Sequence, residues 1–510
     1  MSVGRKLLLC PFLAALVGPY SLWLVSSVDK PLWADELITV ALVKSATLKH
    51  MFSAVLLGLD STPPLYTGYG WLVLHYVVPG TSPEQLLRIT NAGLIAAMLW
   101  ILYLLVRRYF DQATALMTIA AFILLQLWQL KFLTLEVRTY AALVFFTSLA
   151  IYAALRAIDR PSGMTLSCTM LVYCLLASIH IFGLIYVISI VTCMIAAAAC
   201  ERDIRLACWS GLVAVPALIM FLLWVPVLHD EAQLGNWMPH PDFHMLLDST
   251  YPPANRLLFL AALLLLTALT LLWRHGQSRN GPMLTQWRRS ITRTQTFVLL
   301  LPVAFGGSTF AVWLFSQFVF PVFIPRYFSS NIILHTIWLS LLVNFVLSYP
   351  TSSKAKYGLA LASAALAGLG IKYHQFGPED RIPCFSPSRR AYLEDPFINH
   401  GFIVALWSHP WLTRINRPGE AVVYPIDEGA LKENSPFDVY NYHFVQRFAK
   451  WSGVNAIMTT AELLDGKRPF MVLDDRRGPW LKYIQQSHKL KLTPLAQLQR
   501  CTLWKVEALE

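Results

Sequence analysis

Charged residues are scarce in this sequence. Asp, Glu, Lys and Arg together make up only 14% of the 510 residues, whereas apolar residues make up 56%. A soluble domain usually carries about 25% charged residues, so the composition excludes an ordinary soluble enzyme. Apolar runs of about 17 to 25 residues, the length that a helix needs to cross a bilayer, recur from residue 7 to residue 371. The sequence therefore indicates a multi-pass membrane protein.

The sequence signals of several common enzyme mechanisms are also missing. There is no Walker loop, no glycine-rich dinucleotide fingerprint, no Cys/His spacing for zinc and no serine in a nucleophile-elbow pattern. Internal repeats and low-complexity tracts are absent too. The net charge of +12 comes largely from basic loops on one face of the membrane domain, so we expect no nucleic-acid partner.

Two domains are expected, a transmembrane domain over 1–371 and a soluble α/β domain over 372–510. The predicted spans are 7–28, 86–106, 112–130, 138–156, 163–179, 182–200, 206–228, 256–273, 295–316, 327–348 and 356–371. No clean cleavage site follows the first span, so we expect it to remain as an anchor. In the second domain, 420–425 and 469–475 are predicted strands and 479–488 a helix.

The basic residues orient the expected spans. If residues 62–79 lie along the membrane surface, the short loops of one face carry 15 Lys and Arg, and the opposite loops carry seven, or eight with Arg88. The positive-inside rule then makes the first face cytoplasmic, with the N-terminus inside and the C-terminal domain outside. Ten of the 14 acids of residues 1–371 fall on the outer face, where we expect the chemistry.

The first outer loop, 29–85, is expected to be ordered. Its residues 48–59 place apolar side chains at one-face helical spacing, which predicts an amphipathic helix at the membrane interface. Asp35 and Glu36 begin the loop in "WADE". Such a pair suits general-base chemistry, although a solvated helix boundary is the alternative. Asp60 follows in "LDSTPPLY", where the alternative is a helix cap.

Three later segments carry further candidates. In "TLEVRTY", helical spacing places Glu136 and Tyr140 on one side and Arg138 away from them, so we expect Arg138 to meet a ligand; the alternative is snorkelling to headgroups. His180 stands alone in "ASIHIFGL", where a hydrogen-bonded structural role is the alternative.

Arg326 and Tyr327 open a helix after "FIP". A cation there opposes the helix dipole, so an anion is expected nearby, either a protein carboxylate or a ligand phosphate, and we favour the ligand. Separately, Cys384 and Cys501 lie near the two ends of the soluble domain, which predicts a disulfide in an oxidising compartment.

Taken in order, these segments resemble the GT-C membrane glycosyltransferases. The motifs are "WADE", "DSTPPLY", "LLRITNAGL", "LEVRTY", "HIFG" and "PRY", over roughly residues 15–345. The chain is most similar to the protein O-mannosyltransferase / aminoarabinose transferase branch, whose bacterial members use polyprenyl-phosphate sugars. The resemblance implies a polytopic α-helical GT-C fold with about 11 transmembrane helices, juxtamembrane helices in the first outer loop, and a place in the bacterial inner membrane.

The resemblance also implies roles for individual residues. Asp35 matches the catalytic base, with Glu36 as its catalytic neighbour. The implied substrate- and phosphate-binding residues are Asp60, Arg88, Lys131, Glu136, Arg138, Tyr140, His180, Arg326 and Tyr327. Thr62 stands where the family's His-Pro-Pro-Leu-Tyr motif has His, and Asp60 is the candidate to take over the role of that His. Ile181 stands where the family's His-Tyr-Phe-Gly turn has Tyr.

The implied reaction is an inverting transfer of a hexose or pentose from a polyprenyl-phosphate donor. The acceptor is a lipid, a polysaccharide or a protein on the extracytoplasmic face, and the lipid bilayer is the other partner. The resemblance implies no definite cofactor. A divalent metal occurs in the wider superfamily, but the sequence names no residues that would bind one here. One alternative is a transporter or flippase of lipid-linked sugars, which predicts charges near the bilayer midplane. Another is a non-catalytic sensor of such lipids.

Overall fold

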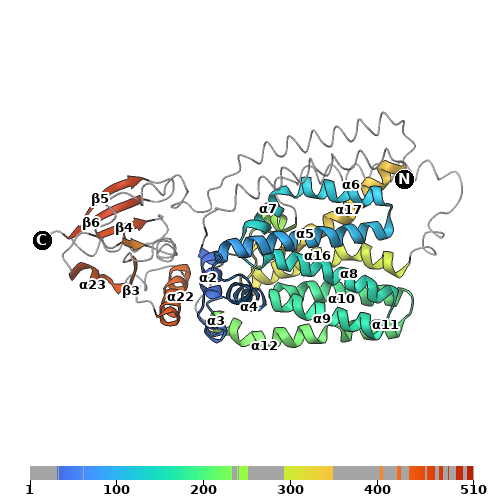
Figure 1. The fold of residues 1–510 in the computed structure, drawn as a ribbon, viewed down its shortest axis with the longest axis horizontal. Helices are drawn as coiled ribbons and strands as arrows, with labels where there is room; N and C mark the ends of the chain where they lie inside the picture. Colours follow the sequence, from blue (N-terminus) through green and yellow to red (C-terminus); the bar gives the residue numbers. More distant parts are fainter. Residues whose placement is uncertain are drawn as a thin grey trace.

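The structure is a computed structural model that describes a helical bundle and a smaller body with a β-sheet at one end of it (Figure 1). The described residues are 32, 34–60, 62–232, 238, 240–250, 292–348, 403–405, 422–426, 436–453, 457–465, 470–474, 481, 490–497 and 502–508. The expected spans 7–28, 256–273 and 356–371 lie outside these ranges. So do Cys384, Cys501 and all but one residue of the expected helix 479–488.

The described residues between 34 and 77, which the sequence analysis assigned to the first outer loop, fold into short helices at the end of the bundle that faces the sheet (Figure 1). They are α2 (Ala34–Val43), α3 (Leu48–Leu56), α4 (Leu65–Leu72) and the π-helix η1 (Val73–Val77). Thr47 caps α3 by accepting a hydrogen bond from the backbone N–H of His50. Met51, Ala54 and Val55 are buried, whereas Phe52 and Leu56 remain exposed, so the apolar side chains expected on one face of this helix are divided between the protein interior and the surface. With eight residues in α4 and five in η1, this segment is too short to cross a core of about 30 Å.

Long and short helices together build the bundle. They are α5 (Pro83–Tyr109), α6 (Gln112–Leu125), α7 (Leu127–Leu135), α8 (Tyr140–Asp159), α9 (Gly163–Ile179), α10 (Phe182–Cys200), α11 (Ile204–Leu212), α12 (Val215–Ala232), α13 (Phe243–Thr250), α16 (Arg293–Phe318), the 3-10 helix η4 (Pro325–Asn331) and α17 (Ile332–Ser348). Among the described residues, five helical stretches are long and apolar enough to span a membrane: Pro83–Tyr109, Tyr140–Asp159, Phe182–Cys200, Ile204–Asp230 and Arg293–Phe318.

One expected span, 112–130, was wrong as a single helix. The structure breaks it at Gln126, which has φ −105° and ψ 13° and separates α6 from α7. The buried Gln126 amide lies 2.7 Å from Nδ1 of His335 on α17. A polar side chain inside the bundle needs a hydrogen-bond partner, and this contact provides one at the break. The break also redirects α7 toward the end of the bundle where the first-loop helices lie.

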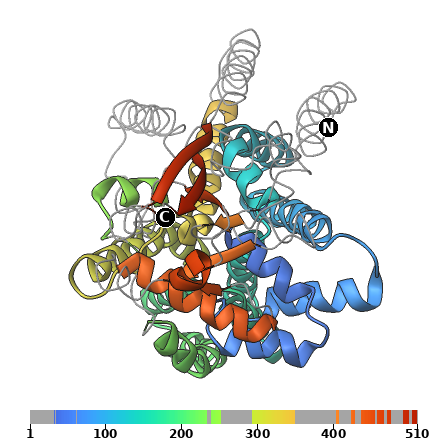
Figure 2. The same ribbon diagram turned by 90° about the vertical axis from the view of Figure 1, so that its left-hand side faces the viewer.

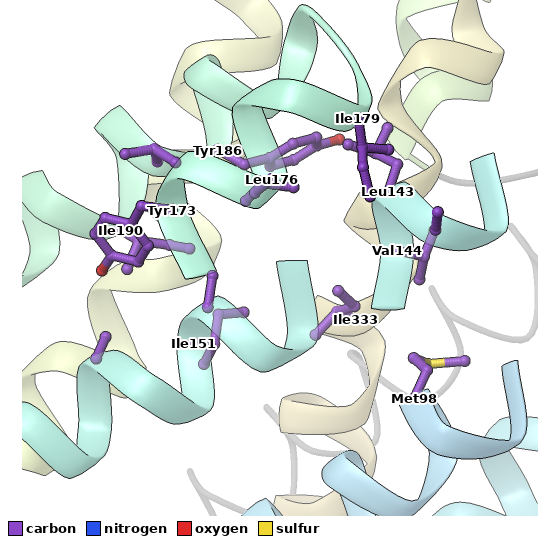
Figure 3. Packing of buried hydrophobic residues seen from close by; sticks show 14 of the residues in the cluster. Met98, Leu143, Val144, Ile151, Tyr173, Leu176, Ile179, Tyr186, Ile190 and Ile333 are labelled. Atoms are coloured by element: carbon purple, nitrogen blue, oxygen red, sulfur yellow. The ribbon is translucent and has the colours of Figure 1, made fainter. Parts of the chain in front are cut away.

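The largest apolar core lies among α5, α8, α9, α10, α16 and α17. Figure 3 shows Ile151 of α8, Tyr173 of α9 and Ile190 of α10 meeting in this core. Small residues let helices approach closely: a Cβ added to Gly183 would lie 2.2 Å from the Leu176 carbonyl oxygen. The core therefore fixes the turn between α9 and α10, which carries His180.

The C-terminal part contains a six-stranded mixed sheet. Its strands are β1 (Ile403–Ala405), β2 (Val422–Ile426), β3 (Ile457–Thr459), β4 (Phe470–Asp474), β5 (Leu490–Gln497) and β6 (Thr502–Ala508), in the order β3-β2-β1-β4-β6-β5. The first four pair in parallel, and β6 pairs antiparallel with β4 and β5. The expected strands 420–425 and 469–475 correspond to β2 and β4. Among the residues that the structure describes in this part of the chain, the helices are α22 (Pro436–Ser452) and α23 (Thr460–Asp465).

Candidate functional site

Asp35 forms an ion pair with Arg326 across a long separation in the sequence. Asp35 lies in the first turn of α2, and Arg326 lies in η4. An Nη of Arg326 donates to Oδ2 of Asp35 at 2.9 Å, and the Asp35 side chain keeps 27% of its surface exposed. The anion beside Arg326 is thus a protein carboxylate, the alternative that the sequence analysis set beside a ligand phosphate.

Arg138 makes a second ion pair, deeper in the protein. Its two Nη atoms donate to the Asp60 carboxylate at 3.0 and 3.3 Å. One of them also donates to Oγ1 of Thr39 at 3.0 Å and to the backbone carbonyl of Asp35 at 3.2 Å. Asp60 accepts further hydrogen bonds from the Thr62 hydroxyl, at 2.7 Å, and from the Thr62 backbone N–H. The acidic segment and Arg138 therefore hold one another in place, and Asp60 is not the cap of α4.

The backbone between α7 and α8 is not helical, so the helical-spacing argument for Glu136, Arg138 and Tyr140 was wrong in its premise. Glu136 has the extended values φ −73° and ψ 118°. The carboxylate of Glu36, which is fully buried, accepts a hydrogen bond from the Val137 N–H at 2.7 Å. Glu36 thus ties α2 to the segment that presents Arg138.

Residues of α5 support the same break. Arg88 donates from Nε to the Leu135 carbonyl at 3.1 Å, which provides a partner for one of the last carbonyls of α7. Asn91 donates to the Glu136 carbonyl at 2.6 Å and accepts from the Tyr66 hydroxyl at 2.9 Å. Arg88 therefore stabilises the break between α7 and α8, next to the segment that carries Arg138.

His180 lies beside the two arginines in an aromatic pocket. Its ring centroid is 5.2 Å from that of Tyr327 and 6.0 Å from that of Tyr140, which opens α8. Nδ1 accepts a hydrogen bond from the Phe182 N–H at 3.2 Å, so the proton of the neutral ring lies on Nε2. Nε2 is buried and has no partner among the described residues.

Burial and charge fix the protonation states of this group. Burial lowers the pKa of His180 to about 3, with the charges of Arg138 and Arg326 acting in the same direction. The imidazole is therefore neutral at physiological pH. Burial alone would lower the pKa of Arg138, but the carboxylates of Asp60 and Asp35 outweigh it and raise that pKa. At Arg326, burial also acts to lower the pKa, but the neighbouring Tyr140 and Asp35 outweigh it, so the pKa of Arg326 is raised.

The element that carries Arg326 is anchored at its end. Asn331, the last residue of η4, donates to the Ser249 carbonyl at 3.2 Å and to Oγ1 of Thr309 at 3.0 Å. A buried amide held on two sides keeps η4 in a fixed position against α13 and α16. Arg326 is therefore presented from a firm support, although its own guanidinium remains partly exposed.

The structure gathers most of the residues predicted from the sequence. Asp35, Asp60, Arg138, His180 and Arg326 meet at one end of the bundle, with Tyr140 and Tyr327 around His180. Lys131 is half-buried on α7, and Glu136 is buried at the break.

Thr39 and Asn91 were missed. Thr39 lies one turn after Asp35 on α2, so helical spacing could have found it. Asn91 stood in a quoted motif, but its partners come from other segments.

Within the described ranges, no group of three or more His, Cys, Asp or Glu side chains could hold a metal ion. The carboxylates of Asp35 and Asp60 are instead neutralised by arginine. We therefore assign no reaction step to a metal.

The side chains of Asp35, Asp60, Arg138 and Arg326 thus lie at one end of a helical bundle, which a mixed sheet follows in the sequence. No protein-family model matches the chain, and no curated protein matches it. Among solved structures, the chain is similar to ArnT from Cupriavidus metallidurans bound to undecaprenyl phosphate, with 13% sequence identity and a TM-score of 0.56 over 99% of this chain and 98% of that chain. ArnT in the apo state matches with 11% identity and a TM-score of 0.56, over 97% and 98%. At these identities the similarity shows a shared fold.

Proposed function

We propose that the chain is an inverting glycosyltransferase that moves a sugar from a polyprenyl-phosphate donor to a hydroxyl of a lipid, polysaccharide or protein acceptor. The observation that carries the proposal is the convergence of the partly exposed Asp35 carboxylate with Arg138, Arg326 and His180. A proton acceptor next to several anion-binding donors is the arrangement that this transfer requires. The ArnT structure with the same fold was solved with undecaprenyl phosphate, which supports a lipid phosphate as the partner.

In this proposal, two buried hydrogen-bond donors bind the phosphate of the sugar donor. Nε of Arg138 and Nε2 of His180 are both buried without a hydrogen-bond partner among the described residues. Buried donors are normally paired, so oxygen atoms of a ligand would satisfy them. Both Nη atoms of Arg138 already donate to Asp60, so Nε offers one charged donor, and a neutral imidazole N–H adds a second donor without adding charge. The departing polyprenyl phosphate gains negative charge, which these groups stabilise.

Asp35 acts as the base in this proposal. Its carboxylate takes the proton of the acceptor hydroxyl as the hydroxyl oxygen forms a bond to the anomeric carbon. The bond from that carbon to the phosphate oxygen breaks on the opposite face, which inverts the configuration. Arg326 pairs with Asp35 in the structure, so the arriving donor phosphate competes for the guanidinium and releases the carboxylate for proton transfer.

A cavity in the bundle supports a hydrocarbon-bearing substrate. It has a volume of about 540 Å³ and lies among α5, α8, α16 and α17, with Leu102, Val106, Ile151, Leu301, Ile333 and Ile337 in its wall. Ile333 lies at the start of α17, just after η4, whereas Tyr109, Phe110 and Gln295 place the rest of the wall toward the other end of the bundle. A predominantly apolar wall suits a prenyl chain. It does not suit the passage of a sugar, which argues against the transporter alternative.

The direct test is to incubate the purified full-length protein with a panel of polyprenyl-phosphate sugars and acceptors from the cell envelope. Mass spectrometry follows donor consumption and glycosylated product. We expect consumption of one donor class with inversion at the anomeric carbon. Movement of intact donor across a bilayer without product would overturn the proposal and favour a flippase.

Asp35→Asn tests the base. The amide keeps the size of the side chain but cannot accept the proton, so we expect kcat to fall by about 100- to 10,000-fold. Donor binding, measured by retention of labelled lipid phosphate, should remain within a few-fold of the native value. Glu84→Gln, an exchange of an acid in the first turn of α5, is the matched control. A fully active Asp35→Asn protein would remove this assignment.

A further inference from the structure

The helix α22 of the C-terminal domain lies directly against α3 of the first outer loop. Figure 2, viewed from the sheet side, shows the orange α22 in front of the blue first-loop helices. At one end of the contact, Trp451 Nε1 donates to the His50 carbonyl at 3.0 Å, and His50 Nε2 lies 3.1 Å from the Trp451 carbonyl. The two rings stack with centroids 4.6 Å apart and an interplanar angle of 11°. The contact is thus both polar and apolar.

At the other end of the contact, Arg447 binds the C-terminus of α3. One Nη donates to the Leu57 carbonyl at 2.9 Å, and the other lies 3.5 Å from the Asp230 carbonyl in α12. The last carbonyls of a helix have no partner inside it and carry partial negative charge, so a guanidinium is a suitable cap. His50 lies in the first turn of α3 and Leu57 is its C-cap, so α22 contacts both ends of α3.

An apolar cluster joins α22 to the acidic residues. Val445 and Phe448 of α22 belong to the same buried cluster as Leu37 and Leu59. Leu37 directly follows Glu36, and Leu59 directly precedes Asp60 in the sequence. The C-terminal domain therefore contributes to the packing on which both acidic segments rest.

Only Gly58 and Leu59 separate the Leu57 carbonyl from Asp60. A displacement of α3 would therefore be passed on to Asp60 and to Arg138, which Asp60 holds through two hydrogen bonds. We propose that Arg447 and Trp451 are positioning residues for the transfer reaction, and that the C-terminal domain fixes the catalytic end of the bundle through α3. The inference rests on the proposed function. Neither residue touches the reacting atoms, so each acts through Asp60 and Arg138.

The test compares Trp451→Ala and Arg447→Met with Lys450→Gln in the full-length protein. Lys450 is exposed on the same helix, so its exchange controls for general effects on α22. We expect kcat of the first two variants to fall at least about tenfold, because a small displacement of positioning groups slows the reaction strongly. The control should have the kcat of the native protein. Trp451→Phe, which keeps the ring, and Arg447→Lys, which keeps the charge, should recover part of the loss.

A double-mutant cycle and hydrogen exchange separate positioning from general damage. His50→Ala combined with Trp451→Ala should be no slower than Trp451→Ala alone, because both remove one contact. Backbone amides of residues 54–62 should exchange faster in Trp451→Ala and Arg447→Met, and at the native rate in Lys450→Gln. Native kcat and native exchange in both variants would overturn the inference. A native protein that transfers no sugar would instead overturn the proposed function, and the exchange data would still report on α3.

Discussion

Asp35 and Glu36 are neighbours in the first turn of α2, yet their surroundings differ completely. Successive positions of a helix point about 100° apart, so one side chain turns toward the arginines and the other into the protein. Asp35 keeps more than a quarter of its side-chain surface exposed, where an acceptor hydroxyl can reach it. Glu36 is fully buried and holds the Val137 N–H. Under the proposed function, Asp35 would therefore react with the acceptor, whereas Glu36 supports the segment that carries Arg138.

The buried His180 makes stability depend on pH. In the unfolded chain the imidazole has the ordinary pKa of about 6.5, whereas burial, with Arg138 and Arg326, lowers its pKa to about 3 in the folded protein. Between these values the unfolded chain binds a proton that the folded chain does not. The free energy of unfolding therefore falls as the pH is lowered from about 6.5 toward 3.

We expect His180→Gln to lose this component of the pH dependence. The measurement is denaturant unfolding of both proteins in detergent across that pH range, with His240→Gln, an exchange at an exposed position, as the control. An unchanged slope in His180→Gln would mean that another group takes up the proton.

At the residue scale, the motifs pointed to side chains that the structure brings together, but they did not predict with which partners these side chains pair. The order of "WADE", "LEVRTY" and "PRY" pointed to Asp35, Arg138 and Arg326. The pairing of Arg138 with Asp60 and of Arg326 with Asp35 joins positions 78 and 291 residues apart. Such contacts depend on how the helices pack, which local periodicity does not encode.

The turn after α3 depends on Gly58, which has φ 70°. Residues with a Cβ are disfavoured in this left-handed region by about 1–2 kcal/mol. Gly58→Ala should therefore destabilise the protein by about that amount and also lower turnover, because Asp60 follows two residues later. Gly80, with φ 86° and no atom within 4 Å of an added Cβ, provides the matched control.

Gly80→Ala should show a similar loss of unfolding free energy with native kcat per folded molecule. Both quantities come from chemical unfolding and initial rates on the same preparations. Equal turnover in the two alanine variants would show that the geometry of this turn does not reach Asp60.

Among the elements, hydropathy predicted the long helices well and their interruptions poorly. The expected helices 163–179 and 182–200 agree with α9 and α10, because Ser162 caps the first and His180 ends it. Gln126 gave no such signal, since one amide in an apolar run does not interrupt hydropathy. Its partner, His335, is 209 residues away. Breaks of this kind are fixed by tertiary contacts.

For the whole molecule, the charge distribution predicts the orientation in the membrane. The start of α11, which carries Arg205, should face the cytoplasm, and α22 should face the outside. In a cysteine-free background, Lys450→Cys should react with a membrane-impermeant maleimide in intact cells, and Arg205→Cys only after permeabilisation. Both positions are exposed, so accessibility reports the side of the membrane. The reverse labelling pattern would invert the topology and place the catalytic end inside.

The contact between His50 and Trp451 spans 401 positions of the chain. At roughly 5 to 20 residues per second, a ribosome needs about 20 to 80 s to make that stretch. The first outer loop therefore enters the membrane long before its partner helix exists. If α22 fixes the positions of α3 and Asp60 as proposed, sugar transfer by a newly made chain would begin only after α22 has been synthesised and has packed against α3.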